Sequence, residues 1–478
     1  MKRINYFKNL LFFSMVLFLT CFIGCEKALE EKPKSLVSPS NYYKSVDQIT
    51  LVFAHCIDNF YGYWSGQFPW VNRTTFMHCD QERHGHLVIA ENTGSAMWSA
   101  HYNAIMNLNN VIKALKEGNL EGESQETVDE LMGMARCLRA WNYHYLVQMF
   151  GDVPILTEDT EDYFNVQLSR SPIIDVYNLI VSDYQYAIST LPIDPGQKAH
   201  PNHDVAKALL AKAYLTMASY PLNDASYWSK AADLAWEIIQ DGRYSLVEDI
   251  DNVFSIESET GPEMMWSFIG NELDRAIHPQ CWSSMQGWGD IGVSIPWEQR
   301  FPEQPRKYAY LEMYDADGKH YTEVNNYPGV KKMLYAADFT TGFSTVDCPV
   351  VRYADVLLIY AEAANMANGG PTENAVWAVN QTIDRANGYE ENPAYPLATI
   401  DMSKEDFDTL VIEERNWELC FELADRWFDQ VRKHILEEYA EEADKKNFTV
   451  DDYLFPIPEQ DSRVNPNLKQ NPGYPSYN

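Results

Sequence analysis

The chain has 478 residues, of which 46% are hydrophobic, so it is long enough and apolar enough to bury a large core. Its formal net charge at pH 7 is -32, from 69 acidic and 37 basic side chains. So acidic a surface repels nucleic acids and anionic lipid headgroups, which argues against DNA binding, RNA binding and charge-driven membrane binding. The charge does not argue against neutral or cationic ligands.

The first 24 residues have the pattern of an export signal. Lys2, Arg3 and Lys8 form a basic head, which an apolar run from Leu10 to Thr20 follows. This run is shorter than the roughly 18 residues that a membrane-spanning helix needs. We therefore expect residues 1–24 to be a signal peptide that is removed.

A small residue followed by cysteine ends this segment, at Gly24 and Cys25. The pair resembles the lipobox of bacterial lipoproteins, in which the nucleophilic thiol takes a lipid and becomes the first mature residue. An ordinary secretory signal with an incidental cysteine is the alternative. With Cys25 lipidated, the charged and proline-containing residues 25–40 form a tether to the membrane.

No glycine-, serine- or proline-rich linker interrupts the chain after residue 40, so we expect residues 41–478 to form a single domain. Six cysteines lie in this part without a CxxC pair, and their low density does not fit a disulfide scaffold. We expect most of them to be buried thiols. They are Cys56, Cys79, Cys137, Cys281, Cys348 and Cys420.

Apolar spacing predicts helices along most of the chain. The predicted ranges are 40–60, 97–115, 125–149, 172–191, 204–220, 227–241 and 413–432. Alanine-rich pairs in residues 206–244, and again in 354–387, resemble tetratricopeptide hairpins. Between Gly261 and Pro349, many glycines, prolines and aromatic residues predict an irregular segment that projects from the helices.

An ordered set of segments along the mature chain resembles the SusD/RagB family of outer-membrane nutrient-binding lipoproteins. The segments are YYKSVDQI, RSPIIDVYNLIVSDYQYAI, VAKALLAKAYL, VRYADVLLIYAEAAN, EERNWELCFELADRWFDQVR and LFPIPEQDSRVNPNLKQNPGY. The resemblance implies a mainly α-helical, SusD-like fold built on four tetratricopeptide-like helix pairs. It also implies a lipid-anchored, surface-exposed protein of the outer membrane. Such a protein acts as the lid of a SusC-like TonB-dependent transporter and captures glycans or, in some members, peptides.

Four carboxylates on one predicted helix raise the alternative of glycoside hydrolysis, which needs two of them. They are Glu413, Glu414, Glu418 and Glu422. Arginines alternate with these glutamates at helical spacing, so we expect ion pairs. Catalytic carboxylates would face each other across a cleft, whereas these four lie along a single helix. The sequence has no HExxH, GxSxG or P-loop motif, and residues 287–292, which match GxGxxG, are followed by proline and tryptophan where a helix should begin. We expect neither catalysis nor a cofactor.

A metal site is a second alternative, because His78, Cys79, His84 and His86 carry side chains that bind zinc. Their spacing matches no common zinc site, so we expect a polar loop without metal.

Two predicted loops, residues 60–76 and 282–297, are rich in aromatic side chains. A sugar ring has an apolar face and a rim of hydroxyls, so glycan sites pair flat aromatic rings with hydrogen-bonding groups. The candidate ligand-binding residues are Trp64, Trp70, Arg73, Trp282, Trp288 and Trp297. The run from Arg73 to Phe76 also resembles a stretch near the sugar-binding arginine of the family's starch-binding founder. The tryptophans on predicted helices are expected in the core instead; they are Trp98, Trp141, Trp236, Trp377, Trp417 and Trp427.

The sequence therefore predicts a non-catalytic glycan-binding lipoprotein that delivers its ligand to a transporter. Two alternatives stay open: the same role with a peptide ligand, and a mainly structural role in which the aromatic loops pack against the transporter.

Overall fold

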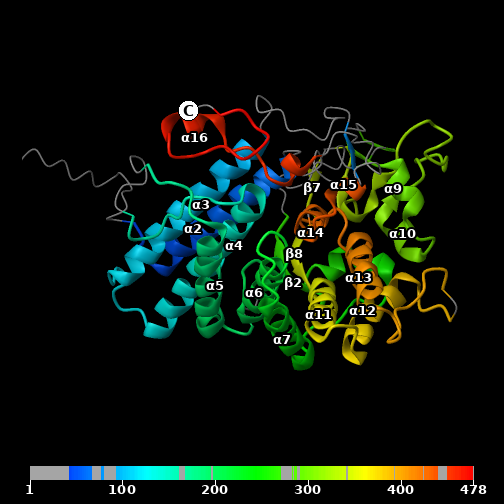
Figure 1. Cartoon of the computed structure of the whole chain (residues 1–478), viewed down its shortest axis with the longest axis horizontal. Helices are drawn as coiled ribbons and strands as arrows, with labels where there is room; N and C mark the ends of the chain where they lie inside the picture. Colours follow the sequence, from blue (N-terminus) through cyan, green and yellow to red (C-terminus); the bar gives the residue numbers. More distant parts are fainter. Residues whose placement is uncertain are drawn as a thin grey trace, which may run out of the picture. The chain divides into compact units, whose positions relative to one another are not determined.

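Helices dominate the computed structural model, as the apolar periodicity predicts (Figure 1). The structure describes residues 42–66, 77–79, 93–160, 167–194, 198–270, 283, 285–287, 291–340, 343–391, 393–423, 425–439 and 449–476. Residues 43–478 make up one compact unit. In the described ranges no helix is both long and apolar enough to cross a lipid bilayer. The signal peptide, the tether and Cys25 lie outside these ranges.

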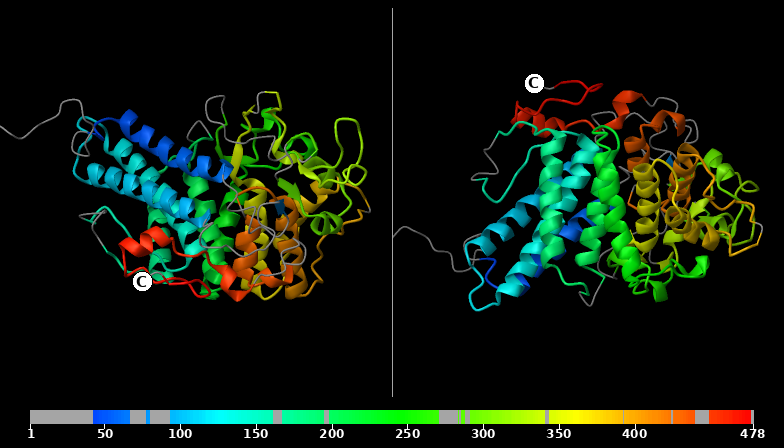
Figure 2. Two further views of the ribbon diagram at one scale, coloured as in Figure 1. Left: turned by 90° about the horizontal axis from the view of Figure 1, so that it is seen from above. Right: turned by 60° about the horizontal axis from the view of Figure 1, so that its bottom comes forward.

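The first half of the unit is a row of helices in which each packs against the next along the chain. They are α2 (Val46–Gly66), α3 (Thr93–Lys116), α4 (Gln125–Phe150), α5 (Ile173–Thr190), α6 (His203–Ala218) and α7 (Ser226–Asp241). Figure 2 shows α3 and α4, in cyan, side by side in both views. The helix boundaries agree with the predicted ones to within a few residues, except for α2, which begins and ends six residues later than predicted.

Sequence signals at the helix ends explain this agreement. Ser124 accepts a hydrogen bond from the backbone N–H of Thr127 at the start of α4, and Asn202 accepts one from Val205 at the start of α6. Gly242 ends α7 in the left-handed conformation, with φ 64°. The prediction that α2 ends near residue 60 is wrong, since a single glycine inside a helix costs only about 1 kcal/mol and Gly62 does not stop it.

The irregular segment predicted between Gly261 and Pro349 is confirmed. Strand β2 (Met264–Phe268) opens it and β8 (Cys348–Arg352) closes it, and the two pair antiparallel with every side chain buried. The chain therefore leaves the helical scaffold and returns to it at one place. Between them the described residues form only short elements: β3 (Ile291–Val293), α9 (Ile295–Arg300), α10 (Pro305–Tyr310), β4 (Leu311–Glu312), β5 (Gly329–Val330), the 3-10 helix η5 (Lys331–Met333), β6 (Ala337–Asp338) and β7 (Phe343–Ser344).

Four further helices continue the row. Helix α11 (Tyr353–Asn368) packs against α7, and both α12 (Glu373–Ala386) and α13 (Lys404–Glu418) pack against α11. Helix α14 (Asp425–Lys433) follows α13, and the short helices α15 (Leu436–Tyr439) and α16 (Glu459–Val464) lie near the C-terminus.

The prediction of one continuous helix over residues 413–432 is wrong, because the helix stops at Glu418 and α14 begins at Asp425. Lys332 explains the break. Its ammonium donates to the carbonyl oxygens of Glu418 and Cys420, at 2.8 and 3.0 Å. In a continuous helix those carbonyls would accept from the backbone instead.

The core is close to the predicted one. Trp98, Trp141, Trp417 and Trp427 are buried, but Trp377 is 42% exposed, so its assignment to the core is wrong. Four of the predicted buried thiols are confirmed as buried and unpaired: Cys56, Cys137, Cys348 and Cys420. Cys79 and Cys281 have side chains outside the described residues.

Candidate functional site

A two-stranded ribbon connects the two aromatic segments that the sequence singled out. Strand β1 (Met77–Cys79) directly follows the first segment, and β3 directly follows Trp282 to Asp290 of the second. The strands pair antiparallel, with Met77 opposite Val293 and Cys79 opposite Ile291. Segments that are more than 200 residues apart in the sequence are therefore attached to neighbouring strands.

A buried carboxylate holds part of the second segment in place. Glu312, on β4, accepts hydrogen bonds from the Ser283 hydroxyl at 2.6 Å and from the Gln286 side-chain amide at 2.8 Å. The Ser283 hydroxyl also accepts from the backbone N–H of Gln286. Burial raises the pKa of Glu312, and these hydrogen bonds partly offset the shift. Glu312 thus fixes Ser283 and Gln286, which precede Trp288 in the sequence.

A second acidic cluster holds the residue from which this segment departs. The backbone N–H of Gly270 donates to Asp347 at 2.8 Å, and the Tyr335 hydroxyl donates to Glu259 at 2.9 Å. Burial raises the pKa of Asp347 to about 7; the hydrogen bond from Gly270 acts against this shift, and the nearby Glu259 carboxylate adds to it. A Cβ at Gly270 would lie 2.4 Å from the Val346 carbonyl oxygen, so the close approach requires glycine here.

Trp297 is not part of an exposed loop, and its assignment to the ligand-binding residues is wrong. It lies on α9 with no exposed surface, packs against Trp417 and Phe301, and donates its indole N–H to Asn416 at 3.2 Å. The sequence contained a signal for this helix, since Pro296 stands in its first turn and Phe301 follows Trp297 at the i, i+4 spacing. A buried indole cannot stack on a ligand.

The other candidate residues lie outside the described part of the structure. Trp70, Arg73, Trp282 and Trp288 belong to the omitted ranges, and of Trp64 only the backbone, in α2, is described. The side chains of the histidine-rich segment, from His78 to His86, are likewise outside. Within the described residues, no group of three or more histidine, cysteine, aspartate or glutamate side chains is arranged to hold a metal ion.

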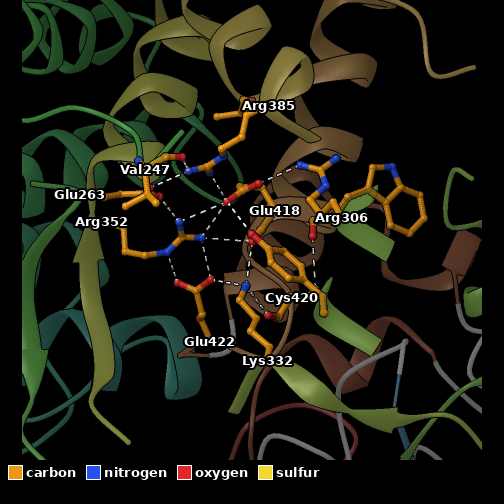
Figure 3. A network of polar contacts seen from close by, with 12 residues as sticks. Val247, Glu263, Arg306, Lys332, Arg352, Arg385, Glu418, Cys420 and Glu422 are labelled. Atoms are coloured by element: carbon orange, nitrogen blue, oxygen red, sulfur yellow. Dashed lines mark hydrogen bonds and ion pairs between the residues drawn. The ribbon is translucent and has the colours of Figure 1, made fainter. Parts of the chain in front are cut away.

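Three of the four glutamates considered for catalysis, Glu414, Glu418 and Glu422, belong to a buried ion-pair network instead (Figure 3), and the fourth, Glu413, pairs with the partly exposed Arg300. Glu418 accepts from Arg385 at 2.7 Å, from Arg352 at 3.1 Å and from Arg306 at 2.9 Å. Four carboxylates face four cations in this network: Glu263, Glu414, Glu418 and Glu422 with Arg306, Lys332, Arg352 and Arg385.

The charges of this network hold separate elements together. Glu418 and Glu414 have no exposed surface, so a substrate does not reach them. Burial acts to raise the pKa of Glu418, but Arg385, Arg352 and Arg306 together lower it far below the ordinary carboxyl range. The group therefore stays ionised, and it does not serve as a general acid.

The ion pairs expected on this helix are present, but their partners differ from the expected ones. Arg415 pairs with Asp355 of α11 and Asp429 of α14, and Arg432 pairs with Glu362 of α11. The sequence spacing suggested pairs along one helix, whereas the network joins α10, α11, α12, α13, α14 and β8.

A cavity of about 560 Å³ opens elsewhere, between the C-terminal ends of α4, α6 and α14, the start of α5 and the C-terminal segment. Tyr177, Tyr220 and Tyr453 contribute aromatic rings to its wall. Arg170 lies beside it and donates to the carbonyl oxygens of Phe150, Asp152 and Lys469 and to the Asn471 side chain. These bonds attach the C-terminal segment to α4, which is a structural role.

Comparison with known proteins identifies the family. Residues 297–474 match a family model described as the SusD family, and residues 58–215 match a related model described as starch-binding associating with outer membrane. The chain belongs to the SusD/RagB family. Members of this family are in general outer-membrane proteins that bind glycans, and they are known as binding proteins rather than enzymes.

Full-length relatives agree with this assignment. The chain is 26% identical to the SusD-like protein P2 of Formosa agariphila, over 96% of this chain and 99% of that protein. It is 24% identical to the SusD-like protein P25 of the same organism, over 96% and 97% of the two chains.

Solved structures share the SusD fold. A SusD homologue from Bacteroides thetaiotaomicron superposes with a TM-score of 0.78 at 20% identity, covering 91% of this chain and 98% of that one. B. fragilis NanU superposes with a TM-score of 0.71 at 21% identity, covering 93% and 100%. The predicted SusD-like helical fold is confirmed.

Proposed function

We propose that this SusD/RagB protein is a non-catalytic, lipid-anchored subunit that captures glycans at the cell surface and delivers them to a SusC-like TonB-dependent transporter. Trp64, Trp70, Arg73, Trp282 and Trp288 form the glycan site in this proposal, and Cys25 carries the lipid.

The pairing of β1 with β3 is the observation that supports a common site. Because the strands are neighbours, the residues just before each strand are attached to the same small ribbon. Two tryptophan-bearing segments that start from one ribbon can contact the same ligand. The Glu312 contacts add support, since they fix Ser283 and Gln286, which lie close to Trp282 and Trp288 in the sequence, before any ligand arrives and so lower the entropic cost of binding.

The residue types fit this ligand class. Indole rings cover the apolar C–H faces of sugars, and a guanidinium donates up to five hydrogen bonds to ring and hydroxyl oxygens. Such sites bind without altering the bond between sugars, which agrees with the sealed position of the Glu414 and Glu418 carboxylates.

Alanine at Trp282 and Trp288 tests the proposal. We expect at least a ten-fold loss of affinity in isothermal titration with the tightest ligand of a glycan panel. Co-purification with the transporter should be unchanged. Tyr314→Ala is the matched control, because Tyr314 is also an exposed ring, at 52%, on a different part of the irregular segment.

The opposite pattern would assign the aromatic loops to docking. If the alanine variants lose the transporter and keep full glycan affinity, the loops pack against the barrel. If a peptide library binds and no glycan does, the ligand class is wrong.

The lipid anchor has a separate test. We expect Cys25→Ser to move the protein from the membrane fraction to the periplasmic or culture fraction, because no other lipid is proposed. Retention of the variant in the outer membrane without its transporter would contradict a Cys25 anchor.

A further inference from the structure

Three aromatic rings from three different helices meet on the surface of the helical row. Trp236 of α7 stacks on Tyr360 of α11, with ring centroids 4.7 Å apart and an interplanar angle of 26°. Trp377 of α12 meets Trp236 at 6.3 Å and 88°. The planes of the two indole rings are therefore nearly perpendicular. We call these three residues the α7–α12 platform.

The platform is open to solvent, although tryptophan is among the most buried residue types. Trp377 is 42% exposed and Trp236 is partly exposed, whereas Tyr360 is 8% exposed beneath them. The sequence neighbours Ala235, Ala378 and Val379 are fully buried, so the two indoles lie at the outer edge of the buried faces of α7 and α12. A large exposed ring pair on a rigid scaffold is typical of a contact surface.

The rings are held in position before any ligand binds. Tyr360 is only 8% exposed, so the side chains around it hold its ring in one place. Thr372 caps α12, the helix that carries Trp377, by accepting from the backbone N–H of Ala375. Trp236 rests on this fixed phenol ring. A preorganised platform loses little side-chain entropy when it binds.

The polar groups around the platform select the ligand. Residues three or four positions away share a helix face, and at Trp236 these include Asp233 and Gln240, while at Trp377 they include Glu373, Asn374 and Gln381. None of the residues at these spacings is basic. Carboxylates and amides accept hydrogen bonds from hydroxyl groups, but the carboxylates repel anions.

We propose that the α7–α12 platform is a second glycan-binding site, which takes neutral sugars and rejects uronate-rich or sulfated ones. This inference rests on the proposed function, since it concerns the same class of ligand, but it places a second contact on elements other than the β1–β3 ribbon. A long polysaccharide would then be held at two points, which raises its apparent affinity by multivalency.

Affinity gel electrophoresis with soluble polysaccharides tests the inference. The probes are neutral amylopectin, galactomannan and xyloglucan, with alginate and dextran sulfate as anionic comparators. The variants are Trp377→Ala, Trp377→Tyr, Trp288→Ala and the double alanine variant, with Tyr314→Ala as the control for an unrelated exposed ring. Circular dichroism checks that each variant is folded.

For a neutral polysaccharide that retards the protein, we expect Trp377→Ala to weaken retardation about ten-fold and Trp377→Tyr to restore most of it. Trp288→Ala should leave residual retardation that the double variant abolishes. Anionic polysaccharides should not retard the protein through this site.

Three results would overturn the inference, and they differ from failure of the proposed function. Full retardation of Trp377→Ala, together with its complete loss in Trp288→Ala, leaves one site only. Loss of transporter co-purification in Trp377→Ala with glycan affinity unchanged makes the platform a protein contact. Equal loss for neutral and anionic probes contradicts the charge argument. If the unmodified protein binds no glycan, the proposed function itself fails.

Discussion

Glu418→Gln is the sharpest test of the buried ion-pair network. The substitution keeps the size and shape of the side chain but removes the negative charge that faces Arg306, Arg352 and Arg385. The other three carboxylates then face four cations, so one positive charge remains buried without compensation. Removing one partner of a buried, hydrogen-bonded ion pair costs roughly 3–5 kcal/mol, and we expect a loss in this range.

Glu413→Gln is the matched control on the same helix. Glu413 pairs with Arg300, whose side chain is 39% exposed, and such pairs contribute about 0–1 kcal/mol. The assay is urea denaturation followed by tryptophan fluorescence, with the midpoints compared at equal slope. If the free energies of unfolding of Glu418→Gln and Glu413→Gln differ by less than about 1 kcal/mol, the network does not stabilise the fold as argued.

The pH dependence of this effect has a definite sign. Burial acts to raise the pKa of Glu418, but the three guanidinium groups hold it well below the ordinary carboxyl range. The stabilisation is therefore complete above the pKa of an unfolded glutamate, about 4.3, and is lost only as the pH falls toward the lower pKa of the folded state. The difference between the variants should thus be constant from pH 6 to 8.

Three further predictions concern other parts of the chain. Asp347→Asn should gain roughly 2–4 kcal/mol of stability relative to the unmodified protein as the pH rises from about 4 to 7, because the folded pKa of Asp347 is raised to about 7, so over this range Asp347 ionises only in the unfolded chain and its ionisation favours unfolding; urea denaturation at several pH values measures this, and a pH-independent difference between the two proteins would refute the argument. Arg170→Ala should cost roughly 2–3 kcal/mol and speed limited proteolysis near the C-terminus, since the four hydrogen bonds that Arg170 donates are lost, two of them to Lys469 and Asn471 of the C-terminal segment; Arg463→Ala, at a surface pair, is the control, and equal proteolysis of both variants would count against this role. Four buried thiols should not react with a disulfide-exchange reagent until the protein unfolds, because burial raises the pKa of each thiol; they are Cys56, Cys137, Cys348 and Cys420. Peptide mass spectrometry identifies the labelled cysteines, and labelling of any of these four in the folded protein would contradict the prediction.

The helices were predictable from sequence because their signals are local. Apolar periodicity, the caps at Ser124 and Asn202 and the terminal glycine Gly242 lie within a few residues of the elements that they define. The irregular segment was predictable for the opposite reason, since its glycines, prolines and aromatic residues fit no period.

The errors arise where distant residues decide the local structure. Lys332 takes the carbonyls of Glu418 and Cys420, so the chain breaks after α13, although residues 413–432 read as one helix. The exposure of a side chain also depends on residues that are distant in the sequence. Trp297 is buried against Trp417, whereas 42% of Trp377 is exposed to solvent. Both tryptophans were assigned from the predicted elements around them, and those elements do not determine burial.

The candidate glycan site likewise depends on contacts between residues that are distant in the sequence. The aromatic composition of its two segments was visible in the sequence, but the pairing of β1 with β3 joins residues more than 200 positions apart. Glu312, which holds Ser283 and Gln286 of the second segment, and Asp347, which holds Gly270, were missed because no motif links them to these residues. Only the three-dimensional fold shows these contacts.

Isothermal titration of the mature protein across a panel of purified glycans, with a reducing-sugar assay on the same samples, tests the central claim most directly. The account predicts saturable binding of at least one neutral glycan, lost on alanine substitution of Trp282 and Trp288, with no release of reducing ends. Release of reducing sugar by the purified protein, or the absence of binding to any glycan in the panel, would contradict it.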